Sequence, residues 1–189
     1  MTETMRHPVR VDEPALHAFF TKLREEIPLT AHMGFEQFHY DLKSLSITAA
    51  LAPNHNDKGT AFAGSLSATA NLCGWGLITL LLEELTEELA EELLEERAEE
   101  SAQESAADRL DRAFDVVIRD SRLEYFLPVT RDFTVTAEFA ADADIDSFVE
   151  KLKAKGKARM DVVVTVMEGG ELCFRLSGAY VALKKKQWL

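Results

Sequence analysis

Hydrophobic and polar positions alternate along this chain with two different periods. Apolar side chains recur at helical spacing over residues 13–26, which predicts an amphipathic helix that ends before Pro28. Residues 35–41 and 45–51 predict a short antiparallel pair of strands, because apolar and polar side chains alternate most clearly in the second. Pro53 ends that pair and opens a loop.

The segment that begins at Gly64 leaves almost no polar face as far as Leu82. A helix that is apolar on every side is a buried helix, so we expect this segment to lie in the core. Gly74 and Gly76 would each weaken an exposed helix by roughly 1 kcal/mol. Their presence predicts a close approach by neighbouring backbone or by a ligand.

The C-terminal half of the chain shows strand character. The predicted strands span residues 116–127, 133–140, 157–167 and 172–183. Gly169-Gly170 predicts a hairpin turn between the last two, and a short surface helix is expected near Phe148. Because the one wholly apolar helix must be surrounded, this order of elements predicts an α+β fold in which an antiparallel sheet wraps around one long buried central helix.

Length and charge give a domain count and exclude one class of partner. With 189 residues the chain is most simply a single domain, residues 1–189. Residues 83–112 contain thirteen acidic residues and three arginines, which accounts for −10 of the net charge of −12. This distribution leaves no broad basic face for nucleic acid. We expect residues 83–112 to form a solvated helical extension or insertion, with a docking arm for a basic partner as the alternative.

Cysteine usage and the N-terminus bear on the cellular compartment. Cys73 and Cys173 lie far apart in apolar patterns, which favours reduced core residues over a disulfide or a metal site. The N-terminal residues lack the apolar region of a signal peptide, and the longest apolar run, 77–82, is too short to span a bilayer. We therefore expect a cytoplasmic protein with no membrane span.

The loop of residues 53–65 places small residues and amides directly before the buried helix. The side-chain amide of Asn54 or Asn56 could donate a hydrogen bond to a developing oxyanion. The backbone N–H groups of Gly64 and Ser65 are expected at the start of the helix, where the dipole favours negative charge. Asparagines after proline are also common turn formers without a chemical role.

Other polar residues extend the candidate site. Asp57 is the one carboxylate in this loop, where it could act as a general base or could cap the turn through its own backbone. Asp120 and Ser121 interrupt an apolar strand face, so they either line the site opposite the loop or form a satisfied polar pair in the sheet. No metal site is expected.

Three segments of the sequence together resemble a known family. Residues 51–65, the Gly74-Trp75-Gly76 triplet and residues 119–130 are similar to those of hotdog-fold thioesterases of the YiiD C-terminal-domain-like type, here in stand-alone form. The resemblance covers roughly residues 13–183 outside the acidic segment. It implies a hotdog fold and a homodimer whose two sheets join edge to edge, with acyl-thioester sites at the subunit interface. The implied substrate is carried on the phosphopantetheine of coenzyme A or acyl carrier protein, and no other cofactor is implied.

The resemblance also implies a choice of reactions within fatty-acid metabolism. It points to Asn56 as a catalytic donor, and related hotdog thioesterases carry an acid on the helix near the position of Asn71. Here the helix has no acid before Glu83, which favours decarboxylation because that reaction needs donors and no base. Thioester hydrolysis is nevertheless the leading expectation, since it is common among hotdog proteins. The alternatives are a malonyl-acyl carrier protein decarboxylase that supplies acetyl primers, and a non-catalytic acyl-thioester-binding module.

Overall fold

A computed structural model of the chain describes residues 13–95 and 114–185. The elements in chain order are α1 (Glu13–Glu26), η1 (Pro28–His32), β1 (Phe35–Tyr40), β2 (Ser44–Ala49), η2 (Ala52–Asn54), α2 (Ala63–Glu95), β3 (Phe114–Tyr125), β4 (Phe133–Phe139), α4 (Ile145–Lys155), β5 (Lys157–Glu168) and β6 (Glu171–Lys184). The predicted helix of residues 13–26 and all six predicted strands are confirmed to within a few residues. The two 3₁₀ turns, η1 and η2, were not predicted.

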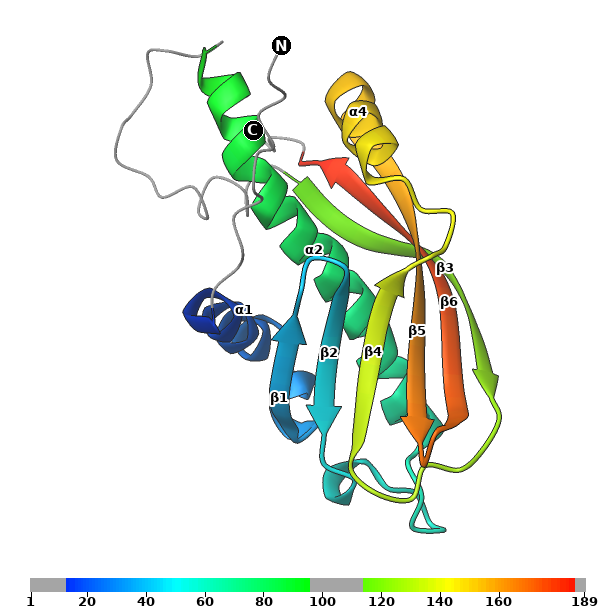
Figure 1. Cartoon of the computed structure of the whole chain (residues 1–189). Coiled ribbons are helices and arrows are strands. Elements are labelled where there is room, and N and C mark those ends of the chain that lie inside the picture. Colours follow the sequence, from blue (N-terminus) through cyan, green and yellow to red (C-terminus); the bar gives the residue numbers. More distant parts are fainter. Residues whose placement is uncertain (1–12, 96–113, 186–189) are drawn as a thin grey trace.

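Six antiparallel strands form one sheet in the order β1-β2-β4-β5-β6-β3. Figure 1 shows the sheet curving around α2, which confirms the expected α+β architecture. The predicted turn at Gly169-Gly170 joins β5 to β6, and both glycines have positive φ values of 63° and 87°. Two successive positive φ values are what a tight two-residue hairpin requires, and they favour glycine.

The core lies between α2 and the concave face of the sheet. Along α2, Leu66, Ala70, Cys73 and Leu77 are spaced so that they share one face, and all four are buried. Alternate residues of the central strands meet them, which explains why β4 and β5 show the clearest alternation. By length and composition the apolar part of α2, Ala63–Leu85, would be sufficient to cross a membrane, but most of its apolar window is buried inside the domain.

Gly74 and Gly76 of α2 are each approached closely by a side chain and not by backbone. A Cβ on Gly74 would lie 2.3 Å from the Tyr180 hydroxyl oxygen, and a Cβ on Gly76 would lie 2.8 Å from Leu45 Cδ2. The expected close approach is therefore present, but the prediction that backbone or a ligand makes it is wrong, because side chains make it. Large side chains of β6 and β2 reach across the narrow layer and require a helix surface without Cβ atoms at these points.

The acidic part of α2 continues the same helix without a break. The helix runs to Glu95 and extends past the strands at one end of the domain (Figure 1). Glu84 is buried there, and the Tyr40 hydroxyl donates a 3.3 Å hydrogen bond to its carboxylate. Burial and this neighbouring carboxylate raise the pKa of Tyr40. The rest of the acidic segment, residues 96–112, lies outside the described residues.

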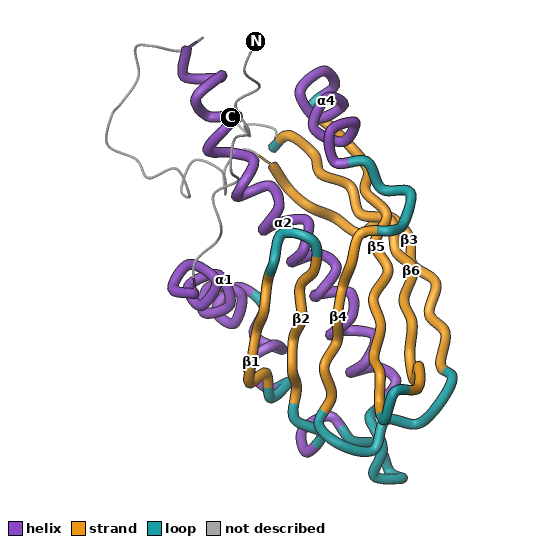
Figure 2. Tube along the Cα trace, in the orientation of Figure 1, coloured by secondary structure: helices purple, strands orange, loops and turns teal. Residues whose placement is uncertain are grey.

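Figure 2 shows the loops that follow β2 and β3 at the same end of the sheet. The first carries residues 50–62 into α2, and the second carries residues 126–132 into β4. A backbone hydrogen bond of 2.8 Å from Ala61 N–H to Val129 C=O joins them. The fold therefore gathers the candidate loop, the start of α2 and the end of β3 in one region.

Candidate functional site

Asn54 anchors the candidate loop to the core. Its side chain is 2% exposed, and its amide nitrogen donates to the Met33 carbonyl at 2.7 Å and to the Ala50 carbonyl at 2.8 Å. Both N–H groups of the amide are therefore engaged inside the protein, which gives Asn54 a structural role.

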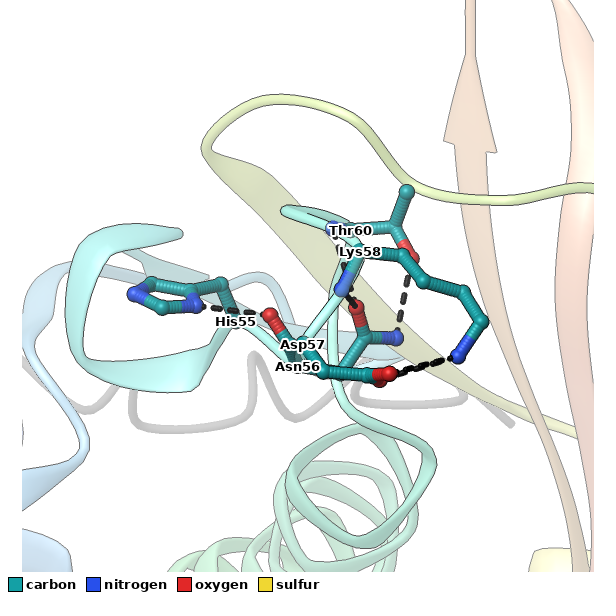
Figure 3. Close-up of polar contacts among 5 residues, drawn as sticks. All are labelled: His55, Asn56, Asp57, Lys58 and Thr60. Atoms are coloured by element: carbon teal, nitrogen blue, oxygen red, sulfur yellow. Dashed lines mark hydrogen bonds and ion pairs between the residues drawn. The ribbon is translucent and has the colours of Figure 1, made fainter.

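Asn56 forms a tight turn with its side-chain oxygen. The Asn56 Oδ1 accepts hydrogen bonds from Lys58 N–H at 2.8 Å and from Thr60 N–H at 3.2 Å, and its amide nitrogen donates to Thr60 Oγ1 at 3.0 Å (Figure 3). Two backbone donors fix which end of the amide is oxygen. One of the two amide N–H groups is thus used by Thr60, and the half-buried side chain is held in one orientation.

Asp57 lies at the exposed tip of the same turn. Its carboxylate is 2.9 Å from Lys58 Nζ, and the two side chains are 79% and 74% exposed. The His55 ring lies on another side of the loop in Figure 3, with its Nδ1 2.9 Å from the Asn56 carbonyl oxygen. Asp57 therefore accepts no capping bond from the loop backbone, and the capping alternative has no support in the hydrogen bonds of this loop.

The start of α2 is open to solvent at Gly64. The first N–H groups of a helix have no partner within the helix, so this exposed turn offers free donors. The ring of Phe62, which is 54% exposed, lies against Gly64 so closely that a Cβ there would be 2.3 Å from its Cε1. Ser65 follows within the first turn and is half-buried.

The loop after β3 braces the candidate loop from the side. Thr130 N–H donates to the Glu168 carboxylate at 2.9 Å, and the Thr130 hydroxyl donates to the same carboxylate. These hydrogen bonds, with the nearby Arg131 guanidinium, lower the pKa of Glu168. The charged carboxylate therefore holds the chain beside Val129, whose carbonyl receives the N–H of Ala61.

Asn71 lies two turns into α2. Its amide nitrogen donates to the Ser67 carbonyl at 2.9 Å, while its Oδ1 is buried and has no hydrogen-bond partner in the part of the chain that the structure describes. The Tyr180 hydroxyl, reaching from β6, donates to the Asn71 backbone carbonyl at 3.2 Å. Burial raises the pKa of Tyr180, so its hydroxyl stays protonated and keeps this bond.

Asp120 and Ser121 both lie on the exposed edge strand β3. The Asp120 carboxylate is 3.6 Å from Arg119 Nε, and both side chains are largely exposed. Ser121 pairs with Gly178 of β6. Within the described residues neither side chain forms a hydrogen bond or ion pair with the Asn56 turn, and the two do not bond to each other as a polar pair. Their predicted role at the site stays a prediction.

Several residues of this region were missed by sequence reasoning. Thr60 and Glu168 hold the two loops, while Phe62 and Tyr180 cover the start and the middle of α2. For these four residues the only sequence signals were Gly64 and Gly74. Each glycine marks a place where an aromatic ring lies against the helix. Among residues 13–95 and 114–185, no group of three His, Cys, Asp or Glu could hold a metal ion.

The chain matches one family model and several solved structures. The family model is described as "Putative thioesterase (yiiD_Cterm)" and matches residues 16–98 and 106–184. A protein of Shewanella oneidensis described as a "putative thioesterase" is 25% identical, with a TM-score of 0.66 over 91% of this chain and 99% of that one. A "probable thioesterase" of Pseudomonas aeruginosa is 19% identical, with a TM-score of 0.60 over 87% and 96%.

A thioesterase of Haemophilus influenzae shares the fold as well, at 14% identity and a TM-score of 0.56 over 87% of this chain and 88% of that one. Together with the sheet wrapped around α2, these likenesses confirm the expected hotdog fold.

Proposed function

The chain belongs to the thioesterase family whose model it matches over most of its length, and we propose that it hydrolyses an acyl thioester at the start of α2. We propose the phosphopantetheine of coenzyme A or acyl carrier protein as the acyl carrier, and the cytoplasm as the compartment. The observation that carries this proposal is the fixed amide of Asn56, which keeps one N–H group available beside an open helix start.

Asn56 is proposed to stabilise the oxyanion that forms when the thioester carbonyl is attacked. Its Oδ1 is held by two backbone N–H groups, so the amide does not need to reorient when charge develops on the substrate. A preorganised donor of this kind is typically worth about 3 kcal/mol of the barrier. The backbone N–H groups of Gly64 and Ser65 are proposed as further donors, supported by the helix dipole.

Asp57 is proposed as the base, because it is the carboxylate closest in sequence to Asn56. Its ion pair with Lys58 is exposed, and an exposed pair contributes little energy, so a bound substrate can separate the two side chains. Asn54 contributes by holding the loop against β2 and η1.

Decarboxylation of a malonyl thioester is the second candidate. One observation favours it: between Ala63 and Leu82, α2 carries no carboxylate that could activate water. Loss of carbon dioxide needs only stabilisation of the enolate oxygen, which the proposed donors would supply. The reaction class therefore depends on whether water attacks the polarised carbonyl carbon or the malonyl carboxylate is lost from the α-carbon as carbon dioxide.

A homodimer joined through β3 is the assembly that we propose. In the part of the chain that the structure describes, β3 is the last strand of the sheet beyond β6, and an exposed edge strand of twelve residues presents unpaired backbone groups to a second strand. Val117 and Ile118 on this edge are 43% and 41% exposed. The opposite edge, β1, is only six residues long.

The charges on β3 restrict how two copies can pair. A two-fold axis between antiparallel strands places one residue opposite itself, and like charges directly opposite destabilise a sheet. This disfavours an axis at Arg119, Asp120, Arg122 or Glu124. An axis at Ser121 places Asp120 of one copy opposite Arg122 of the other on both sides, next to the irregularity of β3 between Ile118 and Asp120. We propose this register.

Disulfide formation tests the register. The two buried native cysteines leave an introduced thiol as the reactive one. A Ser121→Cys variant is expected to form a covalent dimer under mild oxidation, because facing residues meet the Cα separation that a disulfide needs. Arg122→Cys, one position away, is the matched control and is expected to stay monomeric on a denaturing gel. Efficient cross-linking at residue 122 but not 121 would refute the register.

The reaction is tested with the purified protein and acetyl, malonyl and long-chain thioesters of coenzyme A and acyl carrier protein. Free thiol and carbon dioxide are followed separately. Thiol release without carbon dioxide supports hydrolysis, while carbon dioxide with an intact thioester supports decarboxylation. If the protein binds these thioesters and forms neither product, both reactions are refuted and the non-catalytic binding module is the remaining function.

A further inference from the structure

One face of α2 is directed at the edge strand β3. Ala63, Ser67, Asn71 and Trp75 are spaced four residues apart, so they lie one above the other on the helix. Hydrogen bonds with β3 hold both ends of this row. The Tyr125 hydroxyl of β3 donates to the Ala63 carbonyl at 3.3 Å, and Trp75 Nε1 donates to the Val116 carbonyl of β3 at 3.0 Å.

Between these two hydrogen bonds the residues of the row are polar. The Asn71 amide nitrogen donates to the Ser67 carbonyl at 2.9 Å and lies 3.4 Å from Ser67 Oγ. A carbonyl oxygen only accepts hydrogen bonds, so the end of the Asn71 amide that faces the Ser67 carbonyl is the nitrogen. The Asn71 Oδ1 is therefore the atom directed away from the helix. That oxygen is buried and has no hydrogen-bond partner within the described residues.

An unpartnered buried acceptor is rare in folded proteins, because it loses its bond to water without replacement. The backbone of Asn71 is also fixed, since the buried Tyr180 hydroxyl donates to its carbonyl and the Tyr180 ring lies against Gly74. The side chain is thus held in place with its acceptor unused. Helical side chains lean toward the N-terminus, so this acceptor is displaced toward the open first turn of α2.

We propose that Asn71 Oδ1 accepts a hydrogen bond from the water that attacks the thioester carbonyl. This inference rests on the proposed hydrolysis and assigns to Asn71 the orientation of the nucleophile. An amide oxygen is a good acceptor but a very weak base, so Asn71 orients the water and does not remove its proton. The water-positioning group therefore lies on α2, and Asp57 in the loop remains the proposed base.

The step is balanced without any further reactant. The water oxygen forms a bond to the carbonyl carbon, and the bond between that carbon and sulfur breaks. One water proton is lost to Asp57 or to solvent, and the thiolate leaving group takes up a proton. The products are a carboxylic acid and a free thiol, with no oxidation or reduction.

Two substitutions of similar shape separate this role from a structural one. Asn71→Leu removes the acceptor together with an unpartnered buried oxygen, so it is expected to leave the protein folded and to lower kcat at least about tenfold. Asn71→Asp supplies a carboxylate at the same place. Because it is partly buried and one oxygen faces the Ser67 carbonyl, its pKa is expected above the ~3.9 of an exposed aspartate.

Asn71→Asp is therefore expected to raise kcat about 100-fold at pH 8, with a new acid limb in the pH–rate profile between about pH 5 and 7. The purified full-length variants and the wild type are assayed by thiol release from acyl-coenzyme A between pH 4 and 9. Circular dichroism melting provides the folding control. A structural role alone would change melting and leave the pH–rate profile unaltered.

The outcomes separate this inference from the proposed function. If the wild type releases thiol and neither variant changes kcat or the pH profile, the role of Asn71 is refuted and hydrolysis stands. If the wild type is inactive but Asn71→Asp releases thiol, Asn71 faces the bound carbonyl as inferred and natural hydrolysis is refuted. If wild type and Asn71→Asp are both inactive, both are refuted.

Discussion

A methyl group added at Gly74 tests how α2 is packed against the sheet. In Gly74→Ala the new Cβ would lie 2.3 Å from the Tyr180 hydroxyl oxygen and 2.6 Å from its Cζ. Tyr180 is fully buried, and its hydroxyl donates to the Asn71 carbonyl. The ring therefore has no space to retreat into, and the helix or the strand must move.

The expected loss of stability is the balance of three contributions. Overpacking of a buried position costs about 1–3 kcal/mol. Displacing the Tyr180 hydroxyl leaves a buried donor unpaired, which costs about 1–3 kcal/mol more. Against these costs, the higher helix propensity of alanine stabilises the folded protein by about 1 kcal/mol. The balance is a destabilisation of about 3 kcal/mol, equivalent to a Tm lowered by about 6–12 °C for a domain of this size.

Gly64→Ala is the matched control, because its new Cβ would also lie 2.3 Å from an aromatic carbon, Cε1 of Phe62. Phe62 is 54% exposed and can rotate into solvent. The free energy of unfolding of this variant is expected within about 1 kcal/mol of the wild type. Equilibrium urea unfolding of both variants gives the comparison. A Gly74→Ala protein within about 0.5 kcal/mol of the wild type would refute the tight contact between Tyr180 and α2.

Three further predictions concern the loops around the site. Asp57→Asn is expected to lower kcat about 100-fold or more without changing Tm, because its exposed side chain has no structural role; unchanged turnover would remove it as the base. Asn54→Ala is expected to destabilise the protein by about 2–4 kcal/mol in urea unfolding, since two carbonyls lose their donor. The lowered pKa of Glu168 means that its contribution to stability is present above about pH 4.3 and is lost as the pH falls through the folded-state pKa; Glu168→Gln should flatten the fall of Tm on acidification, and an unchanged Tm–pH curve would contradict this.

The main helices and strands were predictable because their apolar residues recur at clear helical or strand spacing. Residues 13–26 form the predicted helix, and the strong alternation in β4 and β5 reflects strands with one buried face. The buried helix was predictable because it lacks a polar side. The turns η1 and η2 were not, since Pro28 and Pro53 signal only where an element ends and not the short 3₁₀ turn that follows.

The sequence places the candidate site in the loop before α2, but it does not predict the contacts that hold this loop. The amides and small residues of the loop indicated where a ligand could be polarised, and the structure holds Asn56 in a fixed orientation there. The anchoring role of Asn54 depends on its hydrogen bond to the Met33 carbonyl, 21 residues away, and no local sequence pattern predicts such a contact. Likewise, the bond between Glu168 and Thr130 joins residues 38 apart. Contacts of this range follow from sheet register, which a single sequence leaves open.

The most direct test of the proposed role of Asn56 is the turnover of an Asn56→Asp variant on acyl thioesters. Aspartate keeps the Oδ1 that accepts from Lys58 and Thr60 N–H, so the turn is expected to keep its shape, while the amide N–H groups are lost. If Asn56 donates to the oxyanion, kcat for thiol release falls about 10²–10³-fold with Tm unchanged. Wild-type kcat in this variant would contradict the claim that Asn56 donates to the oxyanion.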